Sequence, residues 1–255
     1  MASTAPERSV LQPAGPRRRV IFWRHGRTSW NAARRFQGQS DIALDAVGES
    51  QASRAAGLLA GKLMSTPDAP VRIVSSDLSR AYSTAKALAA LTGDDVCVDA
   101  RLRETFGGEW EGLTFDEIID TYPEEIRRWQ RDQPGIRAGG GETRVEVAQR
   151  MVDAILENLQ GLPVGGTLVV ATHGGATRVA LAKLLGLPED LWRTLSGLSN
   201  CHWSVVEESQ AEEPQHENSA TVRAVPAAWR LLEHNVGTLP EPFEIPEELG
   251  EPVED

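Results

Sequence analysis

Three apolar segments of the chain share one unusual feature, which is that each stops abruptly at charged or imidazole side chains. They are residues 20–26 (VIFWRHG), 71–80 (VRIVSSDLSR) and 167–175 (TLVVATHGG). Their continuous runs of β-branched and other apolar residues predict strands that are buried on both faces. The polar residues that close each run are therefore expected at the carboxyl ends of strands.

Segments with helical patterns alternate with these strands. Residues 78–93 and 176–186 each end at a glycine, and residues 50–64 are rich in Ala and Leu. The alternation predicts an α/β fold with three α/β/α layers, in which a mostly parallel central sheet of about six strands has helices on both faces. Residues 201–207 and 229–235 are expected to supply two further strands.

Residues 113–142 have a different character, with two short polar helices followed by a glycine run, and they predict a small helical cap inserted over the site. A phosphate-binding loop at 139–141 is disfavoured because no Lys-Ser or Lys-Thr pair follows the glycines and no strand precedes them. The glycine run is expected to act as a flexible hinge.

Length, composition and charge favour one domain with a flexible N-terminal tail and an acidic C-terminal tail. The 255 residues are 40% hydrophobic and 25% charged, which is typical of a globular protein. Residues 207–255 hold thirteen acids and two arginines and so carry the whole net charge of −11. Nucleic acids and anionic membranes bind basic faces, so neither is expected as a partner.

The cysteines and the N-terminus favour a cytoplasmic protein. Cys97 and Cys201 lack the spacing of a disulfide framework or a metal site, and both are expected to be buried as small apolar side chains. No secretory signal is expected because the N-terminal segment has no apolar run, and no segment is long enough to span a membrane. Without spaced histidine or paired-cysteine ligands, neither a metal nor another cofactor is expected.

The residues at the strand ends suit an anionic ligand. Ligands of open α/β sheets bind outside the carboxyl ends of the strands. His25, flanked by Arg24 and Arg27, is expected there, together with Arg80 and His173. Two imidazoles and several guanidiniums at one edge favour a phosphoryl group.

Two helix N-termini are expected to add backbone donors to this edge. Arg80 lies in the first turn of a helix for which Ser76 or Asp77 is the expected N-cap, and His173 directly precedes a helix that starts at 174–175.

Five motifs, in order along the chain, resemble those of the histidine phosphatase superfamily, the phosphoglycerate-mutase-like proteins with an RHG motif. The resemblance covers residues 19–235, which implies a single domain there with a flexible N-terminal tail at 1–18 and an acidic C-terminal tail at 236–255. It is carried by RHGRTSWN with RFQGQSDIALDAVGESQA after it, SSDLSRAYSTA, RLRETFGGEWEGLT, GGGETRVEVAQR and ATHGG.

The resemblance implies a role for several residues. His25 would be the nucleophile and Glu104 the proton donor. The implied phosphate pocket comprises Arg24, Arg80 and His173, then Asn31 and Gln37, with Thr28 and the backbone around Gly174 as lesser candidates.

The physical chemistry of these residue types agrees with the implied roles. Surrounding cations lower the pKa of His25 and so keep a lone pair available for attack on phosphorus. Glu104 would protonate the leaving oxygen. The alternative for Glu104 is an ion pair with Arg103 or Arg101.

The sequence also suggests where two acids and two tryptophans that follow Glu104 are located. Glu109 and Glu111 alternate around Trp110 and are expected to face solvent rather than to form a second carboxylate pair. Trp110 and Trp129 are candidates for lining a sugar-sized pocket.

The resemblance favours a phosphatase over a mutase because the segment after Glu104 is TFGGEWEG and the chain reaches GGGET quickly. We expect a metal-independent phosphomonoester hydrolase that acts through a phosphohistidine on a small phosphorylated metabolite, a sugar phosphate or phosphoglycerate. The motifs are most similar to actinobacterial phosphatases of glucosyl-3-phosphoglycerate. A phosphoglycerate mutase and an inactive phospho-ligand binding module are the alternatives, and a homodimer is left open.

Overall fold

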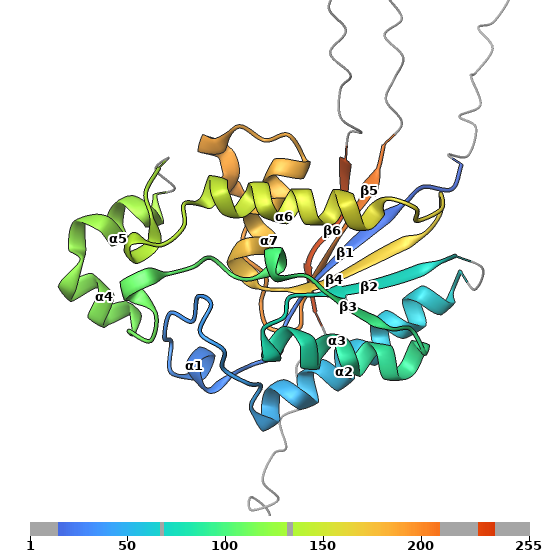
Figure 1. The fold of residues 1–255 in the computed structure, drawn as a ribbon, viewed down its shortest axis with the longest axis horizontal. Coiled ribbons are helices and arrows are strands. Elements are labelled where there is room, and N and C mark those ends of the chain that lie inside the picture. Colours follow the sequence, from blue (N-terminus) through green and yellow to red (C-terminus); the bar gives the residue numbers. More distant parts are fainter. Residues whose placement is uncertain (1–14, 67–68, 132–134, 210–228, 238–255) are drawn as a thin grey trace, which may run out of the picture.

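A six-stranded sheet with the order β3-β2-β4-β1-β5-β6 forms the centre of the molecule (Figure 1). This computed structural model describes residues 15–66, 69–131, 135–209 and 229–237. The strands β1 to β4 are parallel, and β5 and β6 are antiparallel to their neighbours. The expected α/β class and mostly parallel sheet are confirmed. The strands are β1 (Arg19–Arg24), β2 (Val71–Ser75), β3 (Val96–Val98), β4 (Thr167–Thr172), β5 (Trp203–Glu208) and β6 (Trp229–Val236).

Helices cover both faces of the sheet because successive side chains of a buried strand point to opposite faces. From β1, Val20 and Phe22 join the core beneath α6 (Arg144–Leu159) and α7 (Gly174–Leu184). Ile21 and Trp23 join the core beneath α2 (Ala46–Met64) and α3 (Ser79–Thr92). Figure 1 shows the two pairs of helices on opposite sides of the strands.

The cap consists of α4 (Phe115–Thr121) and α5 (Pro123–Gln130), which lie beyond one end of the sheet in Figure 1. A capping box between Thr114 and Glu117 starts α4, and Pro123 begins α5. The cap has its own small core. That core contains Phe36, Trp110, Ile118, Ile126 and Ala138. The described residues also form the short helix α1 (Ser29–Ala32) and the 3-10 turns η1 (Ala100–Leu102), η2 (Gly108–Trp110), η3 (Ala138–Gly140) and η4 (Glu189–Thr194).

Gly139 and Gly141 serve close packing, which argues against the flexible hinge expected for the glycine run at 139–141. A Cβ on Gly139 would lie 2.2 Å from the carbonyl oxygen of Gly107, and one on Gly141 would lie 2.0 Å from that of Phe106. Gly139 is also buried and has a positive φ of 53°. Two backbone segments thus meet where no side chain fits, which joins the cap to the segment after Glu104.

Two further expectations on local structure need correction. Cys97 was expected to be buried but is exposed in β3, because β3 is the edge strand of the sheet. Cys201 is buried, as expected, but lies in a turn with a positive φ of 56°. The first fourteen residues of the predicted N-terminal tail, and residues 238–255 of the acidic tail, lie outside the described residues.

Within the described ranges, no helix combines the length and the apolar character needed to cross a lipid bilayer.

Candidate active site

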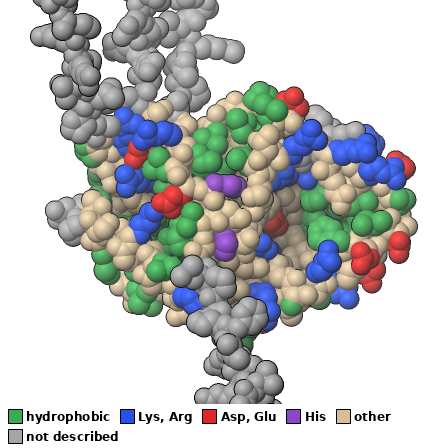
Figure 2. All heavy atoms as spheres, turned by 180° about the vertical axis from the view of Figure 1, so that it is seen from behind, with side chains coloured by type: hydrophobic (Ala, Val, Ile, Leu, Met, Phe, Trp, Pro, Cys, Tyr) green, Lys and Arg blue, Asp and Glu red, His purple; other side chains and the backbone are tan. Residues whose placement is uncertain are grey.

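The carboxyl ends of β1, β4 and β2 meet at one edge of the sheet, where backbone hydrogen bonds hold the following residues together. The His25 amide donates to the Thr172 carbonyl at 3.0 Å, and the Ser76 amide donates to that of Ala171 at 2.9 Å. Figure 2 shows a hollow beside the cap in which basic and acidic side chains are visible. A cavity of about 220 Å³ is lined here by Arg24, His25, Asn31, Arg35, Phe36, Gln37, Gly38, Arg80, Glu104, Thr105, Phe115, Trp129 and Gly175.

A larger cavity, of about 570 Å³, lies at the opposite end of the strands, where Arg19 and Thr167 begin β1 and β4. It is lined by none of the residues that the sequence assigns to the site, so the smaller cavity is the candidate active site.

One ring nitrogen of His25 is available for reaction, and the other is engaged in a hydrogen bond that orients the ring. The residue is 3% exposed, and Nδ1 lies 2.7 Å from the carbonyl oxygen of Gly26. Because a carbonyl only accepts, Nδ1 carries the hydrogen in the neutral ring and Nε2 carries the lone pair. Burial, then the charges of Arg24 and Arg80, hold the pKa of His25 well below its ordinary value.

Two arginines fix positive charge beside His25. The Arg80 side chain is fully buried and donates from Nη1 to the Ser40 carbonyl at 2.7 Å and from Nη2 to the Gly38 carbonyl at 2.8 Å. Burial lowers the pKa of Arg80 to about 10, which leaves it charged near neutral pH. Arg24 donates to the Leu198 carbonyl at 2.6 Å, and burial lowers its pKa while the Glu104 carboxylate opposes that effect.

His173 is the N-cap of α7 and lies against His25. The two ring centroids are 5.2 Å apart, with the planes at 61°. His173 Nε2 lies 3.0 Å from the hydroxyl oxygen of Ser76. Within the described part of the chain, Nδ1 has no hydrogen-bond partner. Burial, followed by the charge of Arg80, holds the pKa of His173 well below its ordinary value.

Glu104 lines the cavity beside the N-terminus of α7. Its Oε1 accepts from the Ala176 amide at 2.8 Å and the Thr105 amide at 2.9 Å, and its Oε2 accepts from the Gly175 amide at 2.9 Å. The amides of Gly175 and Ala176 are donors that the N-terminus of α7 leaves free. The carboxyl group is thereby held in a single orientation that faces the cavity.

The alternative of an ion pair between Glu104 and a neighbouring arginine is wrong. Arg103 pairs with Asp77, and Arg101 pairs with Asp99 and Glu157.

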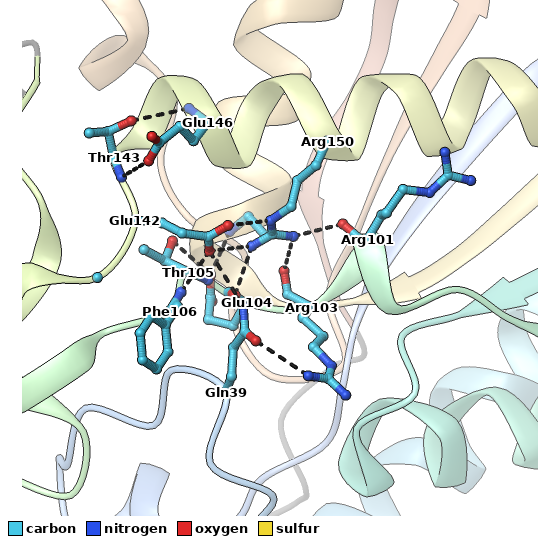
Figure 3. Close-up of polar contacts among 12 residues, drawn as sticks. Gln39, Arg101, Arg103, Glu104, Thr105, Phe106, Glu142, Thr143, Glu146 and Arg150 are labelled. Atoms are coloured by element: carbon cyan, nitrogen blue, oxygen red, sulfur yellow. Dashed lines mark hydrogen bonds and ion pairs between the residues drawn. The ribbon is translucent and has the colours of Figure 1, made fainter.

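The backbone of Glu104 is held by a network that sequence reasoning missed (Figure 3). Arg150 donates to the carbonyls of Arg101 and Arg103 at 2.7 Å and to that of Glu104 at 2.9 Å. Glu142 binds the same guanidinium at 2.7 and 2.8 Å. The only signal in the sequence was that both residues belong to GGGETRVEVAQR, and nothing local assigned them to Glu104.

Asn31 and Gln37 line the cavity, and Thr28 supports both of them. Asn31 Oδ1 accepts from the Thr28 amide at 3.1 Å in the capping box of α1, and Gln37 Oε1 accepts from the Thr28 hydroxyl at 2.9 Å. With these oxygens engaged, the amide groups of Asn31 and Gln37 have their N–H donors left for a ligand.

Thr28, His173 and Gly174 are not among the residues that line the cavity. A Cβ on Gly174 would lie 3.3 Å from Cδ and Nε of Arg24 and 3.0 Å from the Leu198 carbonyl, so this glycine leaves room for the Arg24 side chain.

The expected N-cap of the helix that carries Arg80 is wrong. α3 begins at Ser79, its N-cap is Leu78, and no side chain of the N-cap binds the helix. Asp41 accepts from the amide and hydroxyl of Ser79 instead, at 2.8 and 2.7 Å.

The expectation that Glu111 faces solvent is also wrong. Its carboxylate accepts from the amides of Gln39, Ser40 and Gly107 at 2.8 to 2.9 Å, and so it fixes the loop that follows Gln37. Glu109 is exposed as expected, and it accepts from the Tyr122 hydroxyl.

An aromatic wall completes the cavity on the cap side. Trp129 lines the cavity, as proposed for it, whereas Trp110 is fully buried in the cap core. Sequence reasoning missed Phe36 and Phe115, whose ring centroids are 6.2 Å apart, and Arg35. In the described residues, no group of three or more His, Cys, Asp or Glu side chains is arranged to hold a metal ion.

Comparisons with known proteins agree with this geometry. The family model "Histidine phosphatase superfamily (branch 1)" matches residues 20–217. A glucosyl-3-phosphoglycerate phosphatase from Mycolicibacterium vanbaalenii is 40% identical over 192 residues, which is 73% of this chain and 82% of that protein. A probable phosphoglycerate mutase from Escherichia coli O1:K1 is 39% identical over 192 residues, or 74% of this chain and 84% of that protein.

Among solved structures, a mycobacterial glucosyl-3-phosphoglycerate phosphatase in complex with VO3 has a TM-score of 0.74 and 36% identity, covering 86% of this chain and 100% of that one. The fold, the ordered motifs and these matches lead to one conclusion. This chain belongs to the histidine phosphatase superfamily.

Proposed function

We propose that the protein is a metal-independent phosphomonoesterase in which His25 is the nucleophile. The observation that carries the proposal is the state of the buried His25 ring, whose Nδ1 hydrogen is donated to Gly26 and whose Nε2 lone pair remains in a cavity shared with Arg24, Arg80 and Glu104. A low pKa keeps this lone pair available at neutral pH.

In the first step, Nε2 of His25 forms a bond to phosphorus while the bond from phosphorus to the ester oxygen breaks. Glu104 gives its proton to the departing alkoxide. Oε2 accepts one hydrogen bond from the described residues, from the Gly175 amide, and so has a lone pair left to carry that proton.

In the second step, water attacks the phosphohistidine, and Glu104 takes the proton that the water loses. The bond from Nε2 to phosphorus breaks, which releases inorganic phosphate and restores the neutral imidazole. The same carboxyl group thus acts as acid and then as base.

Fixed donors stabilise the charge on the transferring phosphoryl oxygens. We assign this role to Arg24, Arg80 and the amides of Asn31 and Gln37. His173 is the further donor, because the Ser76 hydroxyl can donate to Nε2 and leave the hydrogen on Nδ1. By analogy with the loss of one oxyanion-hole donor, removal of either guanidinium is expected to cost about 3 to 4 kcal/mol in the transition state.

For the substrate we propose glucosyl-3-phosphoglycerate or a related phosphoglycerate. Relatives that carry this phosphatase name match at 40% identity over most of the chain. The aromatic wall at Phe36, Phe115 and Trp129 supports a ligand with an apolar sugar face.

A phosphoglycerate mutase is the second candidate, since probable mutases match at nearly the same identity. The two reactions differ in the acceptor of the phosphoryl group, which is water in a phosphatase and a second hydroxyl in a mutase.

The test is phosphate release from glucosyl-3-phosphoglycerate, 3-phosphoglycerate and a panel of sugar phosphates in the presence of EDTA. The proposal expects release of inorganic phosphate that EDTA leaves unchanged, with glucosyl-3-phosphoglycerate among the best substrates. Interconversion of phosphoglycerates without net phosphate release would establish the mutase instead. Binding of these ligands without turnover of any, p-nitrophenyl phosphate included, would establish a binding module.

We also propose a cytoplasmic location and leave the homodimer to measurement. The support for the cytoplasm is the phosphorylated metabolite proposed as substrate. Subcellular fractionation tests the location, and analytical ultracentrifugation of the full chain decides between monomer and dimer.

A further inference from the structure

Asn200 connects the backbone of His25 with the side chain of Asn31. It lies in the turn between η4 and β5, and its Nδ2 donates to the His25 carbonyl at 3.1 Å and to Asn31 Oδ1 at 3.2 Å. The NH2 group of an amide carries two hydrogens, so it can make both bonds at once. Asn200 lies outside the five motifs that assign roles in the sequence.

The turn that carries Asn200 is tied to the end of β1 and to β6. The Cys201 amide donates to the same His25 carbonyl at 3.2 Å, and the Ser199 amide donates to Asn235 Oδ1 at 2.9 Å. Cys201 has a positive φ of 56°, which a residue other than glycine adopts where its surroundings hold it. The Asn200 side chain therefore extends from a backbone that is fixed on both sides.

The partners of Asn200 determine which way its amide group faces. A carbonyl oxygen only accepts hydrogen bonds, so the end of the Asn200 amide beside the His25 carbonyl must be the NH2 group. The same NH2 group faces Asn31, so the Asn31 atom opposite it must be the oxygen. The orientation of the Asn31 amide is thus set by the backbone of His25, two hydrogen bonds away.

A second donor sets the same orientation of Asn31. The Thr28 amide only donates, and Asn31 Oδ1 accepts from it at 3.1 Å. The Thr28 hydroxyl has one hydrogen and lies closer to Gln37 Oε1, at 2.9 Å, than to Asn31 Oδ1, at 3.2 Å. The two lone pairs of Asn31 Oδ1 are therefore used by Thr28 and Asn200, and the amide group offers N–H donors to the cavity that Asn31 lines.

Two donors hold this amide group better than one. The last torsion of an asparagine side chain has a broad minimum, so a single hydrogen bond from Thr28 would leave the plane of the Asn31 amide free to turn. Asn200 adds a donor from a distant segment of the chain, which fixes that plane.

We propose that Asn200 is a positioning residue, which holds the Asn31 amide with its N–H groups towards the transferring phosphoryl group. The inference rests on the proposed function, in which Asn31 is one of the donors to the phosphoryl oxygens. It adds a residue that acts through Asn31, because Asn200 is not among the residues that line the active-site cavity.

The test measures the affinity of the protein for inorganic phosphate by calorimetric titration, which needs no turnover. Asn200→Leu keeps a side chain of similar shape but has no hydrogen to donate. We expect it to weaken phosphate binding about three- to tenfold, because the Asn31 amide can then turn. Asn31→Ala removes the donor itself and should weaken binding about tenfold.

The double variant separates positioning from a general structural role. If Asn200 acts through Asn31, Asn200→Leu should change the phosphate affinity of the Asn31→Ala protein by less than about twofold, since no amide is left to orient. Equal weakening by Asn200→Leu with and without the Asn31 side chain would overturn the proposal. Unchanged affinity in the Asn200→Leu single variant would overturn it as well.

Asn158→Leu is the matched control. Asn158 is partly buried, as Asn200 is, and its Nδ2 donates to the Ala154 carbonyl within α6, where neither residue lines the active-site cavity. This variant should leave the phosphate affinity unchanged. Asn200→Ala adds no bulk to the turn and should reproduce the result of Asn200→Leu even if the leucine impairs folding, which thermal unfolding would show.

Turnover of p-nitrophenyl phosphate by the wild-type protein tests the proposed function separately. Coupled phosphate affinities of Asn31 and Asn200 without any turnover would keep the positioning role and remove the enzyme. Turnover with independent effects of the two residues on phosphate affinity would keep the enzyme and remove the positioning role.

Discussion

At the scale of single residues, the account depends on the protonation of a few buried groups. His25 and His173 are both buried, and the pKa of each lies well below its ordinary value because burial and neighbouring arginines disfavour the cation. The sequence allowed this prediction for His25, since Arg24 adjoins it and Arg80 was expected at the same edge. The sequence did not predict the hydrogen bond from Nδ1 to the Gly26 carbonyl, which leaves the lone pair on Nε2, because the orientation of a side chain depends on its surroundings.

The first prediction concerns stability in acid. In the unfolded chain both histidines titrate near their ordinary pKa of about 6.5, whereas in the folded protein they stay neutral to lower pH. As the pH falls below about 6.5 the unfolded state binds more protons, so the free energy of unfolding falls by up to about 1.4 kcal/mol per pH unit for each histidine. The loss continues until the pH reaches the lower pKa of the folded state.

Thermal unfolding between about pH 7.5 and 5 measures this effect. The His25→Asn variant should show a shallower fall of Tm across the window than the wild type, whatever its Tm at neutral pH. Equal slopes for the two proteins would contradict a depressed pKa at His25.

The second prediction concerns Glu104 as the proton donor. Glu104→Gln should lower kcat/KM on an alkyl phosphate by about 10²- to 10⁴-fold, and by much less on p-nitrophenyl phosphate, whose leaving group needs no proton. Glu109→Gln is the control, since Glu109 is an exposed acid that binds the Tyr122 hydroxyl. Equal losses on both substrates would remove the acid role from Glu104.

At the scale of elements, local rules predicted the helices and strands but not the contacts that join them. The alternation of apolar strands with Ala-rich helices placed β1, β2, β4, α3 and α7 correctly. The predicted N-cap of α3 was wrong because Asp77 pairs with Arg103 and because Asp41, from a distant loop, binds the start of the helix. Glu111 was misassigned for the same reason, since its partners belong to the loop at 39–40 and to Gly107.

The third prediction concerns the network that holds the segment before Thr105. Arg150 is a positioning residue, because it binds the backbone of Glu104 rather than the cavity. Arg150→Met should lower kcat/KM on an alkyl phosphate by about 10- to 100-fold, since a small misplacement of a catalytic group is costly. The loss on p-nitrophenyl phosphate should be smaller, as for Glu104→Gln, and Arg150→Lys should restore part of the activity.

A purely structural role for Arg150 would lower both activities equally, in step with the fraction of folded protein. That pattern would contradict the positioning role.

The fourth prediction concerns the glycines that join the cap to the sheet domain. Gly141→Ala should destabilise the protein by about 1 to 3 kcal/mol, because its Cβ would lie 2.0 Å from the Phe106 carbonyl. Gly57→Ala, on the exposed face of α2 with open space around the Cβ, should stabilise it by about 0.5 to 1 kcal/mol. Denaturant unfolding measures both, and a neutral Gly141→Ala would restore the hinge interpretation.

At the scale of the whole molecule, the sequence predicted which strand ends would lie together, but not the tertiary contacts between their side chains and the cap. Parallel strands place their carboxyl ends at one edge of a sheet, so the sequence predicts that His25, Arg80 and His173 lie together. The contact between the Arg144 guanidinium and the Trp129 ring was not predictable, because it depends on how α5 of the cap lies against the start of α6. Such contacts depend on tertiary structure that no spacing along the chain encodes.

The most direct measurement of the central claim is a search for a phosphorylated His25. The protein is mixed with a radiolabelled phosphate monoester, quenched in alkali within milliseconds, and mapped by proteolysis and mass spectrometry. We predict an acid-labile label on the peptide that contains His25 in the wild-type protein, and no label with His25→Ala. Turnover without any label on that peptide, or a label that survives the loss of His25, would contradict the account.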